Sequence, residues 1–516
     1  MARSVLILLT AATLAAQPPQ KFRTFYAGDA PEIPPALRES KRVEAVATDG
    51  AVWTGTSHGL TRLDKSAPPE DRNQYFASKR YLPDDEVIAV VPDSSRGVWV
   101  RTRTGVSHIE LRPMTLAQKA EAFEQRVQSR HDRYGMVAGS ELREPGNLAT
   151  NQLRSSDNDG LWTAMYAAAE CFRYAATHSP EALARARRAI DAVLFLEQVT
   201  GRPGFPARSY VKKTETRPKD GIWHWTPDGE IQWKGDTSSD EIVGHLFIFG
   251  IAFDLLDDPA LKTRIIATTR RIMDHILTHG YYLTDVTGEP TLWGRWSPEY
   301  FASKRGIPDS PLNALELLSF LKTAHHITGD QRYAAEYRKV AFEMKYAELA
   351  TRQLELCPEI NYSDEELAML PFYLLFRYEH DAEPLGHYRR SLDAWWKNIR
   401  REKNPLWTYI YRTGRDVSKQ EMDGALWTLY RIPMDLVEWT ITNSHRKDIE
   451  FDPALDRFGK RQVRTLLPAD ERPVMKWNGN PFRIDGGNSG RGEDDGAFFL
   501  LPYWMARYQG IVAADQ

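Results

Sequence analysis

The sequence predicts a mainly α protein, an (α/α)6 or (α/α)7 toroid that follows a small N-terminal β module. Three observations favour this fold class. Helical hairpins recur from residue 116 onward, and each pairs an apolar helix with an amphipathic one. Long polar loops precede several of the apolar helices. Near the N-terminus, two short stretches rich in β-branched residues and glycine repeat each other.

The first residues have the pattern of a secretory signal peptide. Arg3 precedes the apolar run 5–14, and the small residues Ala15 and Ala16 follow it. We therefore expect a signal peptide at residues 1–16, a linker at 17–40, and a secreted or periplasmic bacterial protein. The apolar run is too short to cross a bilayer stably, so we expect no membrane span.

Residues 41–112 contain the N-terminal repeat. Trp53 and Gly59 of the first copy correspond to Trp99 and Gly105 of the second, at one constant spacing. Alternating apolar residues and glycine turns predict β-hairpins, and the spacing is close to the ~40–45 residues of a propeller blade. The stretch resembles the repeats of two-component-regulator propellers. Since two copies do not close a propeller, we expect a small β module with a structural or docking role.

Residues 115–516 contain the helical hairpins. An all-round apolar helix must be buried and its amphipathic partner covers it, so the hairpins predict two concentric layers. Inner helices are expected to begin near Asp157, Asp240, Pro311, Ser363, Asp423 and Asp494. A seventh pair results if the helix at 116–133 completes another hairpin. An open solenoid is the alternative, but solenoid loops are short and regular, whereas 201–239, 281–310 and 467–494 are long.

Composition and motifs exclude several functions. The formal net charge of −3 gives no basic excess for binding nucleic acid. The two cysteines, Cys171 and Cys357, are too few for a zinc site or a disulfide framework. We find no phosphate-binding loop, dinucleotide fingerprint, serine-hydrolase elbow or H-E-x-x-H pattern. We therefore expect no cofactor and no catalytic metal, with a structural calcium ion left open.

The loops before the inner helices should meet on one face of the toroid, because alternate helices of a hairpin array point the same way. The dense polar stretch 233–245 lies on this face, and so do many of the fifteen tryptophans. Aromatic rings pack on the apolar faces of sugars, and amide, guanidinium and carboxylate groups bond their hydroxyls. The residues expected to bind substrate are Trp162, Trp225, Trp233, Lys234, Asp240, Glu241, Trp293, Trp296, Trp477, Asn478, Arg483 and Glu493.

Two kinds of catalysis fit a sugar cleft on this face. A glycoside hydrolase needs two carboxyl groups, one of them protonated, and the candidates are Asp159, Asp240, Glu241 and Asp494. A polysaccharide lyase must neutralise a uronate carboxylate, abstract the adjacent proton and protonate the leaving oxygen. His245 lies about one turn inside an apolar helix. Tyr300 follows Arg295, the kind of cation that a tyrosine base requires, because tyrosine has a pKa of about 10.

The signal peptide, the helical toroid and this Asn/His/Arg/Tyr set resemble the toroid-type polysaccharide lyases, such as glucuronan and alginate lyases, over residues 115–510. The resemblance implies that Asn158 helps to neutralise the carboxylate and that His245 and Tyr300 are base and acid. It also implies that Arg295 tunes Tyr300. The large C-terminal β-sandwich usual in these lyases has no counterpart in the sequence.

We therefore expect a secreted lyase that cleaves a uronic-acid polysaccharide by β-elimination. The first alternative is a glycoside hydrolase that uses paired carboxylates on the same toroid. The second is a glycan-binding protein without catalysis. The expected partner is a polysaccharide or an oligosaccharide in each case.

Overall fold

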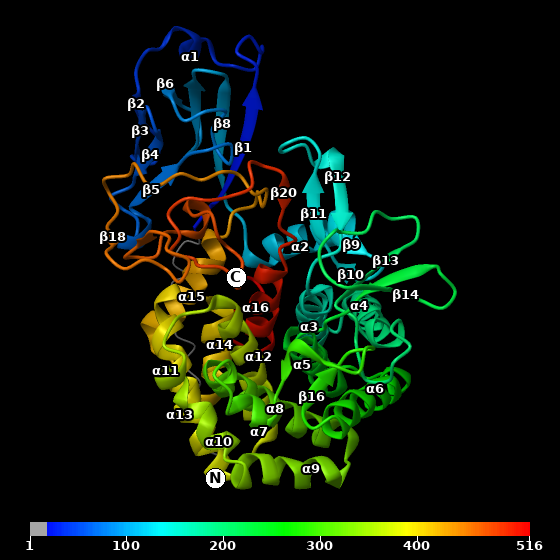
Figure 1. The fold of residues 1–516 in the computed structure, drawn as a ribbon. Helices are drawn as coiled ribbons and strands as arrows, with labels where there is room; N and C mark the ends of the chain where they lie inside the picture. The colour runs from blue at the N-terminus through cyan, green and yellow to red at the C-terminus, as the bar shows by residue number, and fades with distance from the viewer. Residues whose placement is uncertain (1–17) are drawn as a thin grey trace, which may run out of the picture.

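A computed structural model describes residues 18–516, so the predicted signal peptide at 1–16 lies outside the described residues. A β module, blue in Figure 1, lies above a larger helical domain. Among the helices of residues 18–516, none has both the length and the apolar character needed to cross a membrane.

The β module consists of two four-stranded antiparallel sheets, ordered β2-β3-β4-β5 and β1-β8-β7-β6. Trp53 and Trp99 of the two repeats occupy equivalent positions in β3 and β7. The strands are β1 (Gln20–Tyr26), β2 (Glu44–Val46), β3 (Val52–Thr56), β4 (Gly59–Leu63), β5 (Asn73–Phe76), β6 (Val87–Pro92), β7 (Val98–Thr102) and β8 (Val106–Arg112).

The predicted linker at 17–40 is wrong for most of its length. Residues 20–26 form β1, which pairs with β8 from Gln20–Arg112 to Tyr26–Val106. Helix α1 (Pro35–Glu39) then packs against β6 and β7. The physical reason is that β8 offers an edge of unpaired backbone groups, and a neighbouring strand satisfies them.

The helical domain has an inner and an outer layer (Figure 1). Within residues 18–516, six inner helices each contact the next, and α16 contacts α3, which closes the ring. The inner helices are α3 (Asp159–Thr177), α5 (Ser239–Leu255), α8 (Gly306–Thr328), α12 (Tyr362–Tyr378), α14 (Pro405–Gly414) and α16 (Ala497–Tyr508). The outer helices are α2 (Leu116–Arg126), α4 (Pro180–Gln198), α6 (Pro259–Thr278), α9 (Gln331–Arg338), α13 (Ala382–Ile399) and α15 (Lys419–Arg431).

The prediction of an (α/α)6 toroid with a small β module is confirmed, and the seven-fold alternative is not. Helix α2 packs against α16 and therefore completes the sixth pair. Burial explains the inner layer. Helix α5 is buried without a break from Glu241 to Ala252. A side chain at Gly244 would lie 2.8 Å from the Cα atom of Leu161, so glycine lets α5 approach α3 closely.

The predicted inner helix at Asp423 is wrong, because α15 belongs to the outer layer. The inner position is taken by α14, which contacts α12 and α16 and is buried from Pro405 to Ile410. Helix α15 instead exposes Lys419 and Asp423 in its first turns. The Asp-Gly step that α15 shares with the starts of α3 and α16 therefore does not mark inner placement.

Three long connections rise beside the starts of the inner helices. The first carries the sheet of β13 (Ser209–Lys212), β14 (Trp223–Trp225) and β15 (Ile231–Lys234). The second carries the hairpin of β16 (Tyr282–Thr284) and β17 (Pro290–Arg295). The third, residues 432–496, lies between the β module and the toroid (orange to red in Figure 1). We call it the C-terminal loop segment.

Lys119 connects the outer helix α2 to the C-terminal end of the outer helix α15. Lys119 of α2 has no exposed surface, and its ammonium group donates to the carbonyl oxygens of Leu429 and Tyr430, both at 3.0 Å. It also donates to Gln20 Oε1 of the β module at 2.9 Å. These carbonyl groups end α15, where intrahelical donors are lacking. Lys119 thus joins the β module, α2 and α15.

Replacing Lys119 with methionine should destabilise the protein, because buried acceptors then lose their donor. We expect a cost of about 1–3 kcal/mol, seen as a lower Tm in thermal unfolding followed by circular dichroism. The control is Lys219→Met, which changes an exposed lysine. Equal Tm values for the two variants would contradict this account of the junction.

Candidate active site

Carboxyl groups gather where the inner helices begin. Asp240 opens α5, and Asn158 before α3 donates to its Oδ1 atom at 3.0 Å. Burial raises the pKa of Glu316 on α8 and of Asp364 and Glu366 on α12, and the negative charge of Asp240 adds to the increase in each. For Asp364 the pKa rises to about 6. Carboxyl groups from two neighbouring inner helices therefore lie near Asp240.

Three glutamates lie deeper in the ring, and at most 1% of each residue is exposed. Glu241 has two carboxylate oxygens without a hydrogen-bond partner, and Glu316 and Glu366 have one each. Burial raises the pKa of all three well above the usual range, because a charged carboxylate without partners is costly in a low dielectric. Buried acids of this kind are typical of functional sites.

A cavity of about 270 Å³ lies beside this cluster. Its wall includes the start of α3, strand β11 (Gly139–Leu142) and the two ends of the C-terminal loop segment. Trp162, Glu438, Lys476 and Asp494 all line it. Burial, followed by the charge of Glu438, raises the pKa of Asp494. The ammonium group of Lys476 lies 3.9 Å from the ring centroid of Trp162.

Lys476 acts on both groups of acids. Its positive charge lowers the pKa of Glu366 and of Asp494, against the larger effect of burial. We call the whole arrangement the mouth: Asp240, Glu316, Asp364, Glu366, Glu438, Lys476 and Asp494. Carboxyl groups with raised pKa can donate a proton near neutrality, and ionised neighbours can accept one. The mouth can therefore perform general acid–base chemistry beside an aromatic ring.

The expected place of His245 at the mouth is wrong. The side chain has no exposed surface, and its Nδ1 and Nε2 atoms lie 2.6 and 3.1 Å from the carbonyl oxygens of Glu241 and Val193. Its ring packs edge-on against Phe249. Burial lowers its pKa. His245 is a core histidine whose ring is held by the backbone, so it does not reach a substrate.

Tyr300 and Arg295 lie together as expected, with the guanidinium carbon 5.6 Å from the tyrosine ring centroid. The hydroxyl of Tyr300 donates to Asp309 Oδ2 at 2.5 Å. Burial and this carboxylate raise the pKa of Tyr300, which opposes service as a base. Arg295 itself donates to the carbonyl oxygen of Thr291 at 2.6 Å. The structure thus brings the pair together but does not activate the tyrosine.

The expected substrate-binding residues divide into three groups. Asn158, Trp162, Asp240 and Glu241 lie at or next to the mouth, although Glu241 is buried beneath it. On the surrounding strands, Trp225 is 54% exposed and Trp293 is 46% exposed. These two rings remain available to a bound chain.

The other expected residues have structural partners. Trp233, Trp296 and Trp477 are buried, and Trp296 Nε1 donates to Glu316 Oε2 at 2.8 Å. Lys234 is buried in ion pairs with Asp157 and Asp220, so the expectation that it is free to bind substrate is wrong.

Three more expected residues belong, like Trp477, to the C-terminal loop segment. Glu493 lines the cavity wall, but Arg130 donates to it at 2.7 Å, and its pKa is lowered to about 2 despite burial by the nearby His131, Arg130 and Arg126. Asn478 is exposed, and Arg483 forms a β-bridge with Gln462. Asn478 and Arg483 are not among the residues that line the cavity, and the carboxylate of Glu493 is already bound by Arg130.

Several residues of the mouth were not expected from the sequence. Glu316 carries a signal that could have found it, because it is an acid inside a strongly apolar helical stretch. Glu366 follows two other acids at a polar helix start and does not stand out in this way. Glu438 and Lys476 carry no such signal. They lie in a long irregular segment, and only its path across the toroid brings them to the mouth.

Glu366→Gln should stabilise the protein, and more so at higher pH. The pKa of Glu366 is raised in the folded state, so its favourable contribution is complete below the ordinary carboxyl pKa of about 4.3 and is lost as pH rises through the folded value. Glutamine cannot ionise. We expect the Tm gain to grow from about pH 5 to about pH 8, to roughly 2–4 °C, the effect of about 1 kcal/mol in a large domain.

The matched control for this experiment is Glu359→Gln, which changes an exposed glutamate. Its Tm difference from the wild type should not depend on pH. A Glu366→Gln difference that is equally flat across the pH range would contradict the buried, protonated state of Glu366.

Comparisons with known proteins do not place this chain in a family. No protein-family description matches it, and no curated protein matches its sequence. Among solved structures, it is similar to a sugar epimerase from a ruminal bacterium, with 12% identity over 76% of this chain and 100% of that chain and a TM-score of 0.37. It is also similar to the cellobiose 2-epimerase of Spirochaeta thermophila, with 12% identity, 77% and 98% coverage and a TM-score of 0.38. A family 76 glycoside hydrolase from a bovine Bacteroides thetaiotaomicron strain shows 9% identity, 90% and 98% coverage and a TM-score of 0.39. TM-scores this low do not bear on the activity of this chain.

Proposed function

We propose that the protein is a carbohydrate-active enzyme, a glycoside hydrolase that cleaves a neutral glycan at the mouth. One observation carries the proposal: Glu438, Lys476 and Asp494 line one cavity together with Trp162, and burial raises the pKa of Asp494 there. Hydrolysis of a glycosidic bond requires one protonated and one ionised carboxyl group on either side of it.

Asp494 is the proposed general acid. It lines the cavity, and burial together with the charge of Glu438 raises its pKa, so it retains a proton toward neutrality. It would give this proton to the leaving glycosidic oxygen. Asp240 is the proposed second carboxyl group, because Asn158 donates to its Oδ1 atom and orients it. Its Oδ2 atom has no hydrogen-bond partner among the described residues and is left to act on water or on the sugar.

Trp162 and Lys476 are the proposed binding residues. Trp162 is half-buried and lines the cavity, so the part of its ring that Lys476 and the core leave uncovered can contact a sugar. The ammonium group of Lys476 lies against the same ring and can donate to sugar hydroxyls. Exposed Trp225 and Trp293 would extend the contact to further sugar units.

The charge of the mouth favours a neutral glycan over a polyuronate. Half-exposed acids cluster there, namely Asp240, Asp364 and Asp494, and the charges of Asp309 and Asp495 lie near them. Like charges brought together in a partly desolvated site repel each other. A polymer with a carboxylate on each sugar would therefore be disfavoured, whereas neutral hydroxyl groups can donate to the carboxylates.

The lyase expected from the sequence is the second candidate. The contact between Arg295 and Tyr300 favours it, since a cation beside a tyrosine assists proton abstraction. The raised pKa of Tyr300 and the buried position of His245 count against it. The two candidates differ in their products, because β-elimination leaves an unsaturated uronate that absorbs ultraviolet light and hydrolysis does not.

The test is incubation of the full mature chain with neutral glucans, mannans and xylans and with glucuronan, alginate and pectin. We expect new reducing ends from a neutral polymer without an increase in ultraviolet absorbance. Absorbance from a uronic-acid polymer would establish the lyase and overturn the hydrolase. Binding of glycan without either product would favour a non-catalytic glycan-binding protein.

Asp494→Asn and Asp240→Asn should each lower kcat by about 10²–10⁴-fold, the usual contribution of a positioned acid or base. Neither change should lower the Tm, because both side chains are half-exposed and each substitution keeps the shape of the side chain. The control is Asp416→Asn on the exposed surface. Retention of more than about a tenth of the wild-type kcat by either variant would refute its role.

A further inference from the structure

The C-terminal loop segment reaches the mouth from a fixed point under the β module. Residues 469–471 form the short helix η7 (Ala469–Glu471), and Lys476 follows only a few residues later. Asp470 and Glu471 are buried, and so is Arg472. Lys476 thus has two anchors: η7 on the side of the β module, and Trp477, which is buried in the core of the toroid.

The β module holds η7 through its backbone. Arg80 of the module is 1% exposed, and its Nη1 atom donates to the carbonyl oxygens of Asp470 at 2.8 Å and Arg472 at 3.3 Å. The backbone N–H of Tyr75 donates to Glu471 Oε1 at 3.0 Å. These contacts join residues almost four hundred positions apart in the chain, so they are purely tertiary.

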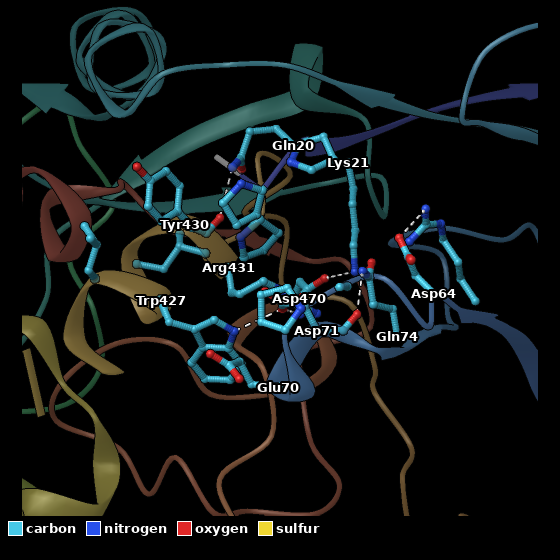
Figure 2. Close-up of a pocket in the computed structure, with 18 of the residues that line it drawn as sticks. Gln20, Lys21, Asp64, Glu70, Asp71, Gln74, Trp427, Tyr430, Arg431 and Asp470 are labelled. Carbon is cyan, nitrogen blue, oxygen red and sulfur yellow. Dashed lines mark hydrogen bonds and ion pairs between the residues drawn. The ribbon is translucent and has the colours of Figure 1, made fainter. Parts of the chain in front are cut away.

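Side-chain charges complete the clamp, as Figure 2 shows. Lys21 of β1 donates to Asp470 Oδ2 at 2.5 Å. On the other side, Arg431 of α15 binds Asp470 at 2.8 Å and Asp71 of the module at 2.6 Å. All of these groups are buried or nearly so. Partners inside a buried network hold one another in a single arrangement, because breaking any pair leaves an uncompensated charge.

We propose that the β module is a positioning element of the mouth: by clamping η7, Arg80 fixes Lys476 against Trp162. The expected effect of Arg80 on catalysis rests on the proposed function, whereas its effect on the position of the loop does not. Arg80 touches no residue of the mouth in the described contacts, so it is a positioning residue, and its effect must pass through Lys476. Misplacement of a binding group by about 1 Å can cost as much as about 10²-fold in rate.

A double-mutant cycle tests this coupling in the full chain. Arg80→Met should lower kcat/KM on the neutral glycan by about 10-fold, and Lys476→Met by about 10- to 100-fold. Because Arg80 acts through Lys476, the double variant should be no worse than Lys476→Met alone, within about 3-fold. Arg80→Lys should restore part of the loss, since one donor is kept. Multiplication of the two single losses in the double variant would overturn the proposal.

The matched control is Arg62→Met. Arg62 is also a buried arginine of the module, but it pairs with Asp49 and Asp64 of the module itself. We expect a comparable loss of Tm and a kcat/KM within about 2-fold of the wild type, since its partners are independent of Lys476. A loss equal to that of Arg80→Met would mean that general destabilisation, and not positioning, is measured.

Hydrogen exchange separates this proposal from the proposed function. The amides of residues 473–477 should exchange faster in Arg80→Met than in the wild type, whereas Arg62→Met should leave them unchanged. This measurement needs no substrate. If no glycan is hydrolysed, the proposed function fails and the exchange result still decides whether the module positions the loop. Unchanged exchange in Arg80→Met would overturn the positioning role even in an active enzyme.

Discussion

The mouth depends on the opposition between burial and the positive ends of the inner helices. The first turns of α-helices leave N–H groups free and stabilise nearby negative charge, and Asp240 lies in the first turn of α5. Deeper in the ring, burial dominates and raises the pKa of Glu241, Glu316 and Glu366. The toroid thus provides, within one site, positions for ionised and for protonated carboxyl groups, which is the requirement for acid–base chemistry on a glycosidic bond.

The β module and the toroid act as one structure around the C-terminal loop segment. The segment contributes Lys476 and Asp494 to the mouth, yet its middle is held by the module through Arg80, Lys21 and Tyr75. Lys119 adds a second junction between the module, α2 and the end of α15. The module therefore has a structural reason to accompany the toroid, although it contributes no residue to the wall of the mouth cavity.

Periodicity and loop length were sufficient to predict the two helical layers, because an inner helix such as α5 is apolar on every side. They did not identify α14 as an inner helix, because ten residues are too few to reveal its burial. They placed α15 in the inner layer, because it shares an Asp-Gly step with the starts of α3 and α16 although its first turn is exposed. The strand β1 was missed because its partner, β8, lies more than eighty residues away. Such pairings are set by tertiary contacts and leave little local signal.

The site was predicted in part. Asn158, Trp162, Asp240 and Asp494 were expected from the polar starts of inner helices, and the fold brings all four to the mouth region. His245 was misplaced because sequence position says only that a residue lies on an inner helix and not which way it faces. Lys476 and Glu438 could not be predicted, since their positions follow from the long path of an irregular segment. Aromatic residues were over-assigned to substrate, because buried Trp233 and Trp296 brace loops.

The central claim is that substrate binds at the mouth between Asp240 and Asp494. The most direct measurement is a crystal structure of the Asp494→Asn variant with a bound neutral oligosaccharide. We expect a sugar ring in contact with Trp162 and sugar hydroxyl groups near Lys476. The glycosidic oxygen should lie within hydrogen-bond distance of the side chain at position 494. An oligosaccharide bound only elsewhere, for example in the cavity of about 660 Å³ between the β module and α15, with the mouth unoccupied, would contradict this claim.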